Sequence, residues 1–192
     1  MQSKKANPFD ECPVYETEHF IYSFIDENDA EDLFACYSDP VTLSHMNNDN
    51  CSGEFRCASI DVMKDAIRCW QEEYERRTFI RWSIKDKDTG KGIGTIEIAP
   101  LPWGKWFFGK ETPIGILRID LLSVYEQEAN FVEIIRLLAS ELANDFEVSQ
   151  VIMKAPPDEL SKVNALATNQ FQPYGKGAFR FEHYFVKTIT SL

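Results

Sequence analysis

The sequence predicts an α+β fold, in which a central mixed and mostly antiparallel sheet is flanked by helices on both faces. Three observations predict it. The apolar residues of 60–74 recur every three or four positions, which is typical of an amphipathic helix. Strand-like segments at 80–84, 93–98 and 116–122 follow one another without a helix, which favours antiparallel pairing. A helix then separates 116–122 from the strand at 151–154, which favours a parallel pair.

The length and charge restrict the classes of protein. A chain of 192 residues fits one domain, and we expect an irregular arm over 1–18 and a single domain over 19–192. With 31 acidic and 20 basic side chains the net charge is −11, which disfavours nucleic acid and membrane surfaces as partners. No signal peptide or membrane span is visible, so we expect a cytoplasmic protein. The five cysteines are unevenly spaced, which predicts reduced thiols and no metal site.

The first half of the chain is expected to alternate between strand, helix and loop. Apolar residues alternate at 19–25, which indicates a strand. Asn28 and Glu31 have the spacing of a capping box, and they predict a helix that ends at Asp39-Pro40. Segment 41–58 has the composition of a loop, and Ser59 is expected to cap the amphipathic helix.

The second half is expected to complete the sheet. A turn at 88–92 joins the first two antiparallel strands into a hairpin, and a long connection spans 99–114. Apolar spacing from Phe131 to Leu142 predicts a helix that reaches about residue 146. The remaining expected elements are the strand at 151–154, a helix at 160–167 and a closing strand at 181–189.

This order, with its residues, resembles the GNAT superfamily of acyl-CoA N-acyltransferases. The similarity extends over about 19–189, and it is carried by segments 29–34, 38–40, 79–84, 92–96 and 117–142. The resemblance implies an enzyme that uses acetyl-CoA as co-substrate and needs no metal. It also implies direct attack of an amine on the thioester, with a small amine or a protein N-terminus as acceptor.

In that family a [QR]-x-x-G-x-[GA] motif cradles the CoA pyrophosphate with main-chain N–H groups at the start of a helix. The matching segment runs from Gln127 to Val132, with Asn130 in place of the first glycine and Glu126 and Glu128 adding negative charge. Asn130 is expected to adopt the left-handed conformation that glycine favours. The resemblance assigns cofactor binding to Leu122, Val124, Gln127, Ala129, Asn130, Phe131 and Val132.

Acetyl transfer from a thioester to an ammonium substrate needs a base. Asp120 and Glu97 are the candidate catalytic carboxylates, because they fall on neighbouring strands. The alternative is that Arg118 forms a structural ion pair with one of them. The family's general-acid tyrosine is replaced by Leu166, so the proton donor is expected to be water or another tyrosine, with Tyr125 and Tyr174 as candidates.

Segment 103–108 is unusually aromatic for a loop, and three interpretations are open. It packs onto the sheet, forms a homodimer contact, or covers a cationic substrate with Trp103 and Trp106 as substrate-binding residues.

Two functions are therefore compatible with the sequence. One is an acetyl-CoA-dependent N-acetyltransferase, and the other is a non-catalytic binding or interaction module on the same fold that has lost CoA binding.

Overall fold

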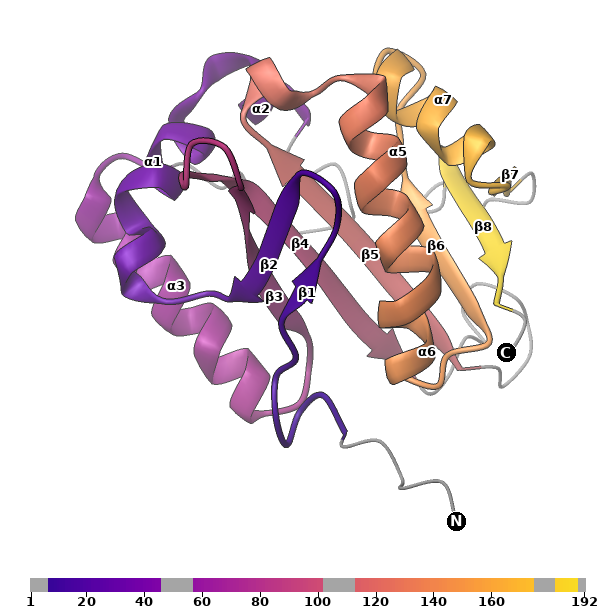
Figure 1. Cartoon of the computed structure of the whole chain (residues 1–192), viewed down its shortest axis with the longest axis horizontal. Helices are drawn as coiled ribbons and strands as arrows, with labels where there is room; N and C mark the ends of the chain where they lie inside the picture. Colours follow the sequence, from indigo (N-terminus) through magenta and orange to yellow (C-terminus); the bar gives the residue numbers. More distant parts are fainter. Residues whose placement is uncertain (1–6, 46–56, 102–112, 175–181, 190–192) are drawn as a thin grey trace.

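The computed structural model describes residues 7–45, 57–101, 113–174 and 182–189. They form an eight-stranded sheet in the order β1-β2-β3-β4-β5-β6-β8-β7 (Figure 1). Neighbouring strands are antiparallel except for β5 and β6, which are parallel. The strands are β1 (Tyr15–Glu16), β2 (Phe20–Phe24), β3 (Ile80–Asp86), β4 (Gly92–Leu101), β5 (Ile114–Leu121), β6 (Gln150–Lys154), β7 (Gln172–Pro173) and β8 (Tyr184–Thr188).

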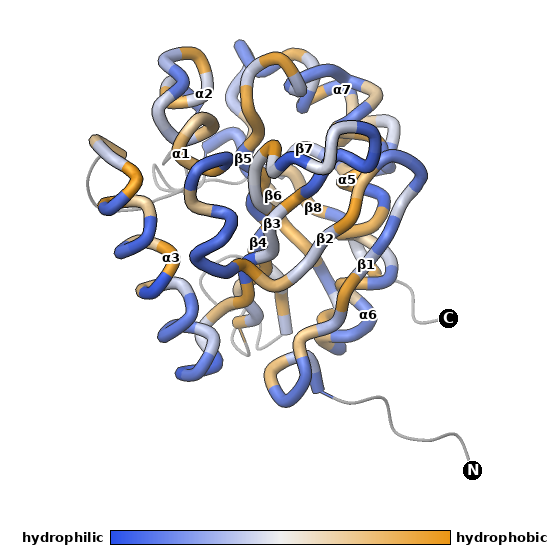
Figure 2. The backbone as a smooth tube through the Cα atoms, turned by 60° about the vertical axis from the view of Figure 1, so that its left-hand side comes forward, coloured by the Kyte–Doolittle hydropathy of each residue, from blue (hydrophilic) through white to orange (hydrophobic). Residues whose placement is uncertain are grey.

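Helices cover both faces of the sheet, and Figure 2 shows the three layers from the side. On one face lie α1 (Ala30–Ser38) and α3 (Ile60–Glu75), with the short α2 (Pro40–His45) beyond them. On the other face lie α5 (Glu128–Leu137), α6 (Ala143–Asp145) and α7 (Leu160–Thr168). The predicted fold class is therefore confirmed.

The two faces of the sheet differ in chemistry. The face toward α5 is apolar: Ile80, Trp82 and Ile84 of β3 pack in the main core with Phe131 and Ile134 of α5. The face toward α1 and α3 carries buried polar side chains on the intervening positions of the same strands. They are Arg81, Ser83, Thr95 and Glu97. A strand presents alternate residues to opposite faces, so the period-two pattern of the sequence separates a packing face from a polar face.

Several local expectations are wrong. The capping box is formed by Asp26 and Asp29 around the 3₁₀ turn η1 (Glu27–Asp29), two residues earlier than the expected pair Asn28 and Glu31. Pro40 begins the helix α2, and residues 41–45 of this helix lie in the segment expected to be a loop; proline is tolerated at the first position of a helix. The short strand β1 lies within the arm expected to be irregular. The helix ending near 146 contains the π-helical turn η3 (Leu138–Leu142) between α5 and α6.

A β-bulge sets the register of the central hairpin. Lys85 lies opposite Gly92, whereas Ile84 lies opposite Gly94, so Ile93 is an extra residue on β4. Gly94 has φ of 153°, and a Cβ there would lie 2.0 Å from the main-chain oxygen of Asp120. Glycine at 94 is thus required for β5 to approach β4 at Asp120.

A pH-dependent contact joins the β1–β2 turn to α5. The His19 main-chain N–H and Nδ1 lie 2.8 and 2.7 Å from the two carboxylate oxygens of Glu133. Hydrogen bonding and charge from Glu133 raise the pKa of His19 above 6.5. Burial raises the pKa of Glu133, but hydrogen bonds from His19 and Thr17 outweigh burial, and the net pKa is lowered.

This contact should stabilise the protein most at acidic to neutral pH. A raised histidine pKa contributes stability below the unfolded-state pKa, and that contribution is lost as pH rises through the folded-state pKa. We expect Glu133→Gln to lower the pKa of His19 and to flatten this part of the stability profile. NMR titration of the histidine ring signals measures the change in the pKa of His19. His45, whose partner is Glu126, is the internal control. An unchanged His19 titration would contradict the assignment.

Candidate functional site

The sheet opens at the end of β5. β5 pairs with β4 along its whole length, but it pairs with β6 only from Ile114 to Leu117. The last part of β5, from Arg118 to Leu121, thus has a free edge on the β6 side. The Leu122 N–H bonds back to Ile93 of β4, so by strand alternation the main-chain groups of Leu121 face this opening.

The short helix α2 closes one end of the opening. The Thr42 hydroxyl donates to the main-chain oxygen of Leu121 at 2.9 Å. The Asp39 carboxylate accepts from the N–H groups of Val41 and Ser123 at 2.9 and 3.1 Å. Burial raises the pKa of Asp39, but the hydrogen bonds outweigh it and the net pKa is lowered. Asp39 therefore stays ionised and holds α2 to the segment that leaves β5.

A row of charged side chains crosses the polar face of the sheet just before the opening. Glu97 of β4 lies opposite Arg81 of β3 on one side and opposite Arg118 of β5 on the other. Arg81 donates to Glu97 Oε2, and Arg118 Nη1 donates to Oε1 at 2.6 Å. Glu97 is only 1% exposed, and both of its oxygens are paired. The predicted ion pair with Arg118 is thus present at Glu97.

Asp120 lies in the next row and keeps one oxygen available. Its Oδ2 accepts from the Tyr37 hydroxyl at 2.8 Å and faces Arg81 Nη1 at 3.4 Å. Within the part of the chain that the structure describes, no partner approaches Oδ1. The side chain is 18% exposed, so that oxygen can meet a ligand. Of the two predicted carboxylates, Asp120 keeps an oxygen without a partner among the described residues, whereas both oxygens of Glu97 are paired.

Tyr37 of α1 connects these groups. Its hydroxyl lies 2.8 Å from Thr95 Oγ1 and accepts from Arg81 Nη1 at 2.7 Å. Burial raises the pKa of Tyr37 well above its usual value, so the phenol stays protonated and donates. Burial alone would lower the pKa of Arg81, but the Tyr37 oxygen and the Glu97 and Asp120 carboxylates raise it. The guanidinium also lies 4.2 Å from the ring centroid of Trp70.

The predicted cofactor residues lie at the start of α5, at the same end of β5. Gln127 is the N-cap residue and has an extended backbone. Phe131 N–H makes the first intrahelical bond, to Gln127, so the N–H groups of Glu128, Ala129 and Asn130 have no partner within the helix. Asn130 is helical, not left-handed, and its side chain donates to the main-chain oxygen of Tyr125 at 3.0 Å. The left-handed expectation is therefore wrong.

The other predicted cofactor residues divide by exposure. Val124 and Ala129 are exposed, Leu122 and Val132 are half-buried, and Phe131 is buried in the core. The two acidic residues of this segment are partly compensated. Glu126 lies 3.0 Å from His45 Nδ1, and Glu128 accepts from the Asn164 amide at 3.0 Å.

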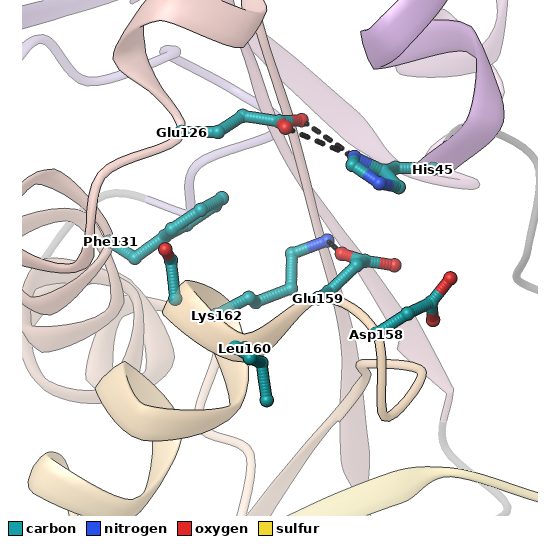
Figure 3. A pocket seen from close by; sticks show the side chains of 8 residues that line it. His45, Glu126, Phe131, Asp158, Glu159, Leu160 and Lys162 are labelled. Atoms are coloured by element: carbon teal, nitrogen blue, oxygen red, sulfur yellow. Dashed lines mark hydrogen bonds and ion pairs between the residues drawn. The ribbon is translucent and has the colours of Figure 1, made fainter.

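A cavity of about 160 Å³ lies between α2, the start of α5 and the start of α7 (Figure 3). Lys162 Nζ donates to Glu159 Oε2 at 2.5 Å and lies 5.6 Å from the ring centroid of Phe131. The cavity is lined by His45, Glu126, Phe131, Asp158, Glu159, Leu160, Ser161 and Lys162.

Sequence reasoning missed Tyr37, Arg81, His45, Glu159 and Lys162. A period-two strand with a buried arginine was a usable signal for Arg81, because a charge on a buried strand needs a partner. The other four come from α1, α2 and the start of α7, and nothing in their spacing relates them to β5.

Other predicted residues lie away from these groups or outside the described ranges. Trp103 and Trp106 are outside the described residues. Burial and the nearby Asp86 carboxylate raise the pKa of Tyr125, which keeps its phenol protonated. The Tyr174 main-chain N–H donates to the Tyr184 main-chain oxygen, at the edge of the sheet formed by β8 and β7.

Two general features complete the description. Among the described residues no helix is both long and apolar enough to cross a bilayer. In those same ranges, three or more His, Cys, Asp or Glu side chains nowhere gather into a group that could hold a metal ion. The thiols of Cys12, Cys36, Cys57 and Cys69 are free.

Comparison by sequence gives one partial relative. No family model matches the chain. Over 84 residues the chain is 32% identical to a Bacillus subtilis (strain 168) protein named "Uncharacterized N-acetyltransferase YoaA". The match covers 44% of this chain and 44% of that protein, so it spans less than half the length of the relative.

Comparison by structure gives similar solved folds. The Vibrio fischeri ribosomal-protein-S5-alanine acetyltransferase has a TM-score of 0.66 at 13% identity, covering 92% of this chain and 97% of that one. A Bacillus anthracis GNAT-family acetyltransferase scores 0.68 at 9% identity, covering 92% and 98%. RimL, a ribosomal L7/L12 alpha-N-protein acetyltransferase solved with coenzyme A, scores 0.67 at 10% identity, covering 92% and 98%. The chain therefore has the fold of the GNAT acetyltransferases, as the sequence resemblance implies.

Proposed function

We propose that this protein is an acetyl-CoA-dependent N-acetyltransferase whose acceptor is a small amine or a protein N-terminus. The observation that carries the proposal is Asp120. It lies in the part of β5 that has left β6, it is held through one oxygen by Tyr37, and its other oxygen has no partner in the described ranges. An anchored carboxylate with a free oxygen at the opening of the sheet is suited to accept a proton.

The residues at this end of the sheet fit acetyl-CoA. The three N–H groups at the start of α5 that have no partner within the helix would form an anion site, which the helix dipole strengthens. The edge of β5 that has left β6 offers main-chain hydrogen bonds to the amides of an extended chain, although Thr42 already donates to the Leu121 oxygen. Glu126, which would repel a phosphate, is engaged by His45. Acetyl-CoA supplies the activated acetyl group as a thioester.

The chain's own residues would then orient and deprotonate the acceptor. An alkylamine is protonated at neutral pH, so it must lose a proton before it can attack. Asp120 Oδ1 takes that proton, while Tyr37 and Arg81 hold Oδ2 and fix the carboxylate direction. Glu97 acts as the anion that keeps Arg81 and Arg118 in place.

The test is acetyl transfer itself. Purified protein is incubated with acetyl-CoA and a panel of alkylamines and N-terminal peptides, and released thiol and acetylated product are measured by absorbance and mass spectrometry. Acetylated amine above the uncatalysed rate supports the proposal. Thiol release without an acetylated product, or no turnover with any acceptor, contradicts it.

Asn130 gives a prediction on cofactor affinity. Asn130→Val removes the bond to the Tyr125 oxygen and adds a branched side chain beside the free N–H groups of α5. We expect it to abolish CoA binding or weaken it at least tenfold while the protein stays folded. Calorimetry measures the affinity and circular dichroism the fold. Asn144→Ala, at the far end of the same helical segment, is the control; unchanged affinity in Asn130→Val would contradict the role of this loop.

The remaining expectations are proposals of the same kind. We propose a cytoplasmic location, no nucleic-acid or membrane partner, and a homodimer in which Trp106 takes part. Trp106→Ala should then weaken self-association in equilibrium sedimentation.

A non-catalytic interaction module is the alternative function, and failure of acetyl-CoA to bind would favour it.

A further inference from the structure

The hydrogen-bonded network on the polar face of the sheet reaches the surface through two side chains of opposite charge. Its buried members are Tyr37, Arg81 and Glu97, of which Glu97 is only 1% exposed. Its other two members, Arg118 and Asp120, have side chains that are 26% and 18% exposed. The buried members hold the network together, while a guanidinium and a carboxylate remain within reach of a ligand.

Arg118 and Asp120 lie on the same face of β5, at the opening of the sheet. They pair with Glu97 and Thr95 of β4, whose side chains belong to the polar face. Residues two apart on a strand are separated by about 6.5–7 Å. Both residues follow Leu117, the last residue of β5 that pairs with β6. One small molecule lying along this part of β5 can therefore contact both side chains.

The charges of this network balance before an acceptor binds but not afterwards. Two guanidinium groups face two carboxylates in the set Arg81, Arg118, Glu97 and Asp120. An ammonium group at Asp120 Oδ1 adds a third cation, and an excess charge in a largely buried network is costly. A carboxylate on the same acceptor, directed at Arg118, restores the balance. Such an acceptor is a zwitterion, so the net charge of −11 on the chain does not repel it.

The chemistry of Arg118 suits a carboxylate ligand. A guanidinium presents its N–H donors in a planar fork that matches the geometry of a carboxylate. Arg118 Nη1 donates to Glu97 Oε1 at 2.6 Å, and this contact with a buried anion fixes the position of the guanidinium. A fixed guanidinium loses little freedom when it binds a second carboxylate from the exposed side.

We propose that Arg118 binds a carboxylate of the acceptor, and that the acceptors are short aliphatic amino acids whose amino group lies at Asp120. The inference rests on the proposed acetyltransferase function, in which Asp120 is the base. It narrows the acceptor from any small amine to an amine that carries an anionic group a few bonds away. Arg118 sets this specificity and takes no part in the proton transfer.

β-Alanine and β-alaninamide are the probes, because they have equal numbers of heavy atoms and only the first carries a carboxylate. Acetylation of each is measured by mass spectrometry in the wild type, Arg118→Gln and Arg118→Lys. Arg76→Gln is the control, since Arg76 is exposed at the end of α3 and its loss removes the same charge from a guanidinium paired with carboxylates.

We expect the wild type to favour β-alanine in kcat/KM at least about tenfold. Arg118→Gln should raise the KM for β-alanine at least about tenfold relative to the KM for β-alaninamide, and Arg76→Gln should leave both unchanged. A purely structural role of Arg118 beside Glu97 would change both probes by the same factor, so the ratio of the two KM values separates the roles. Comparison of variants also cancels any difference in basicity between the two amines.

Equal kcat/KM for both probes in the wild type would overturn the inference, and so would a KM ratio in Arg118→Gln equal to that of the wild type. If Arg118→Gln does not fold, Arg118→Lys decides. Lysine keeps the charge but lacks the planar fork, so the preference for β-alanine should fall. An unchanged preference counts against the inference.

Failure of the inference and failure of the proposed function give different results. Acetylation of amines without a preference for β-alanine leaves the function standing and refutes the role of Arg118. If no acceptor is acetylated, the proposed function fails, and saturation-transfer NMR of β-alanine without acetyl-CoA tests the binding site alone. A β-alanine signal that disappears in Arg118→Gln then supports the site, and absence of the signal in the wild type overturns it.

Discussion

Gly94→Ala should unfold the protein or lower its free energy of unfolding by about 3–5 kcal/mol. The new Cβ would lie 2.0 Å from the main-chain oxygen of Asp120, and backbone cannot move aside as a flexible side chain can. The φ of 153° is also strained for any residue with a Cβ. Chemical denaturation with a circular dichroism signal measures the loss.

Gly90→Ala separates the clash from the backbone strain. Gly90 also has a positive φ, of 69°, but a Cβ there meets nothing within 4 Å. We expect Gly90→Ala to cost only about 1–2 kcal/mol, the usual cost of a left-handed alanine. Equal losses in the two variants would mean that close approach of β4 and β5 at Asp120 is not what requires Gly94.

Asp120→Asn should lower kcat by about 10²–10⁴-fold, the usual contribution of a general base. Asparagine keeps the shape of the side chain and can still accept from Tyr37, so folding should be preserved. Because water must then deprotonate the acceptor, the rate of the variant should recover as pH rises toward the pKa of the amine. Steady-state kinetics between neutral and alkaline pH measure both effects.

Glu97→Gln is the matched comparison, since it removes a carboxylate from the adjacent position of the same network. Glu97 is buried between two arginines, so its loss should reduce stability by about 3–5 kcal/mol. The pH–rate profile of the Glu97→Gln variant should keep the shape of the wild-type profile. If Glu97→Gln instead reproduces the pH-dependent rate loss and Asp120→Asn does not, the roles assigned to the two carboxylates are exchanged.

The fold was largely predictable because its periodicity is strong. Apolar residues alternate in β3 and recur every three or four positions in α3, and both patterns predict their elements. The hairpin turn at 88–92 places two strands side by side. The pairing register of β3 and β4 could not be predicted from the sequence. Counting from Lys85 opposite Gly92 without a bulge places Arg81 opposite Ile96, and the extra residue Ile93 moves it to Glu97.

The site was predictable only where it lies on one strand. Asp120 and Arg118 share a face because strand residues two apart do. Tyr37 reaches Asp120 from a helix 83 positions away in the chain, and His45 reaches Glu126 across 81 positions. Such contacts follow from how α1 and α2 pack on the sheet, and no local pattern encodes them. Asn130 illustrates a different failure, because propensity favoured a left-handed residue where the helix simply begins earlier.

Isothermal titration of the protein with acetyl-CoA, with desulfo-CoA as a non-reactive control, tests the central claim most directly. We predict saturable binding of both ligands with micromolar dissociation constants, weakened in Asn130→Val and retained in Asp120→Asn. No binding at millimolar acetyl-CoA would contradict the account and would make the protein an interaction module on a GNAT fold.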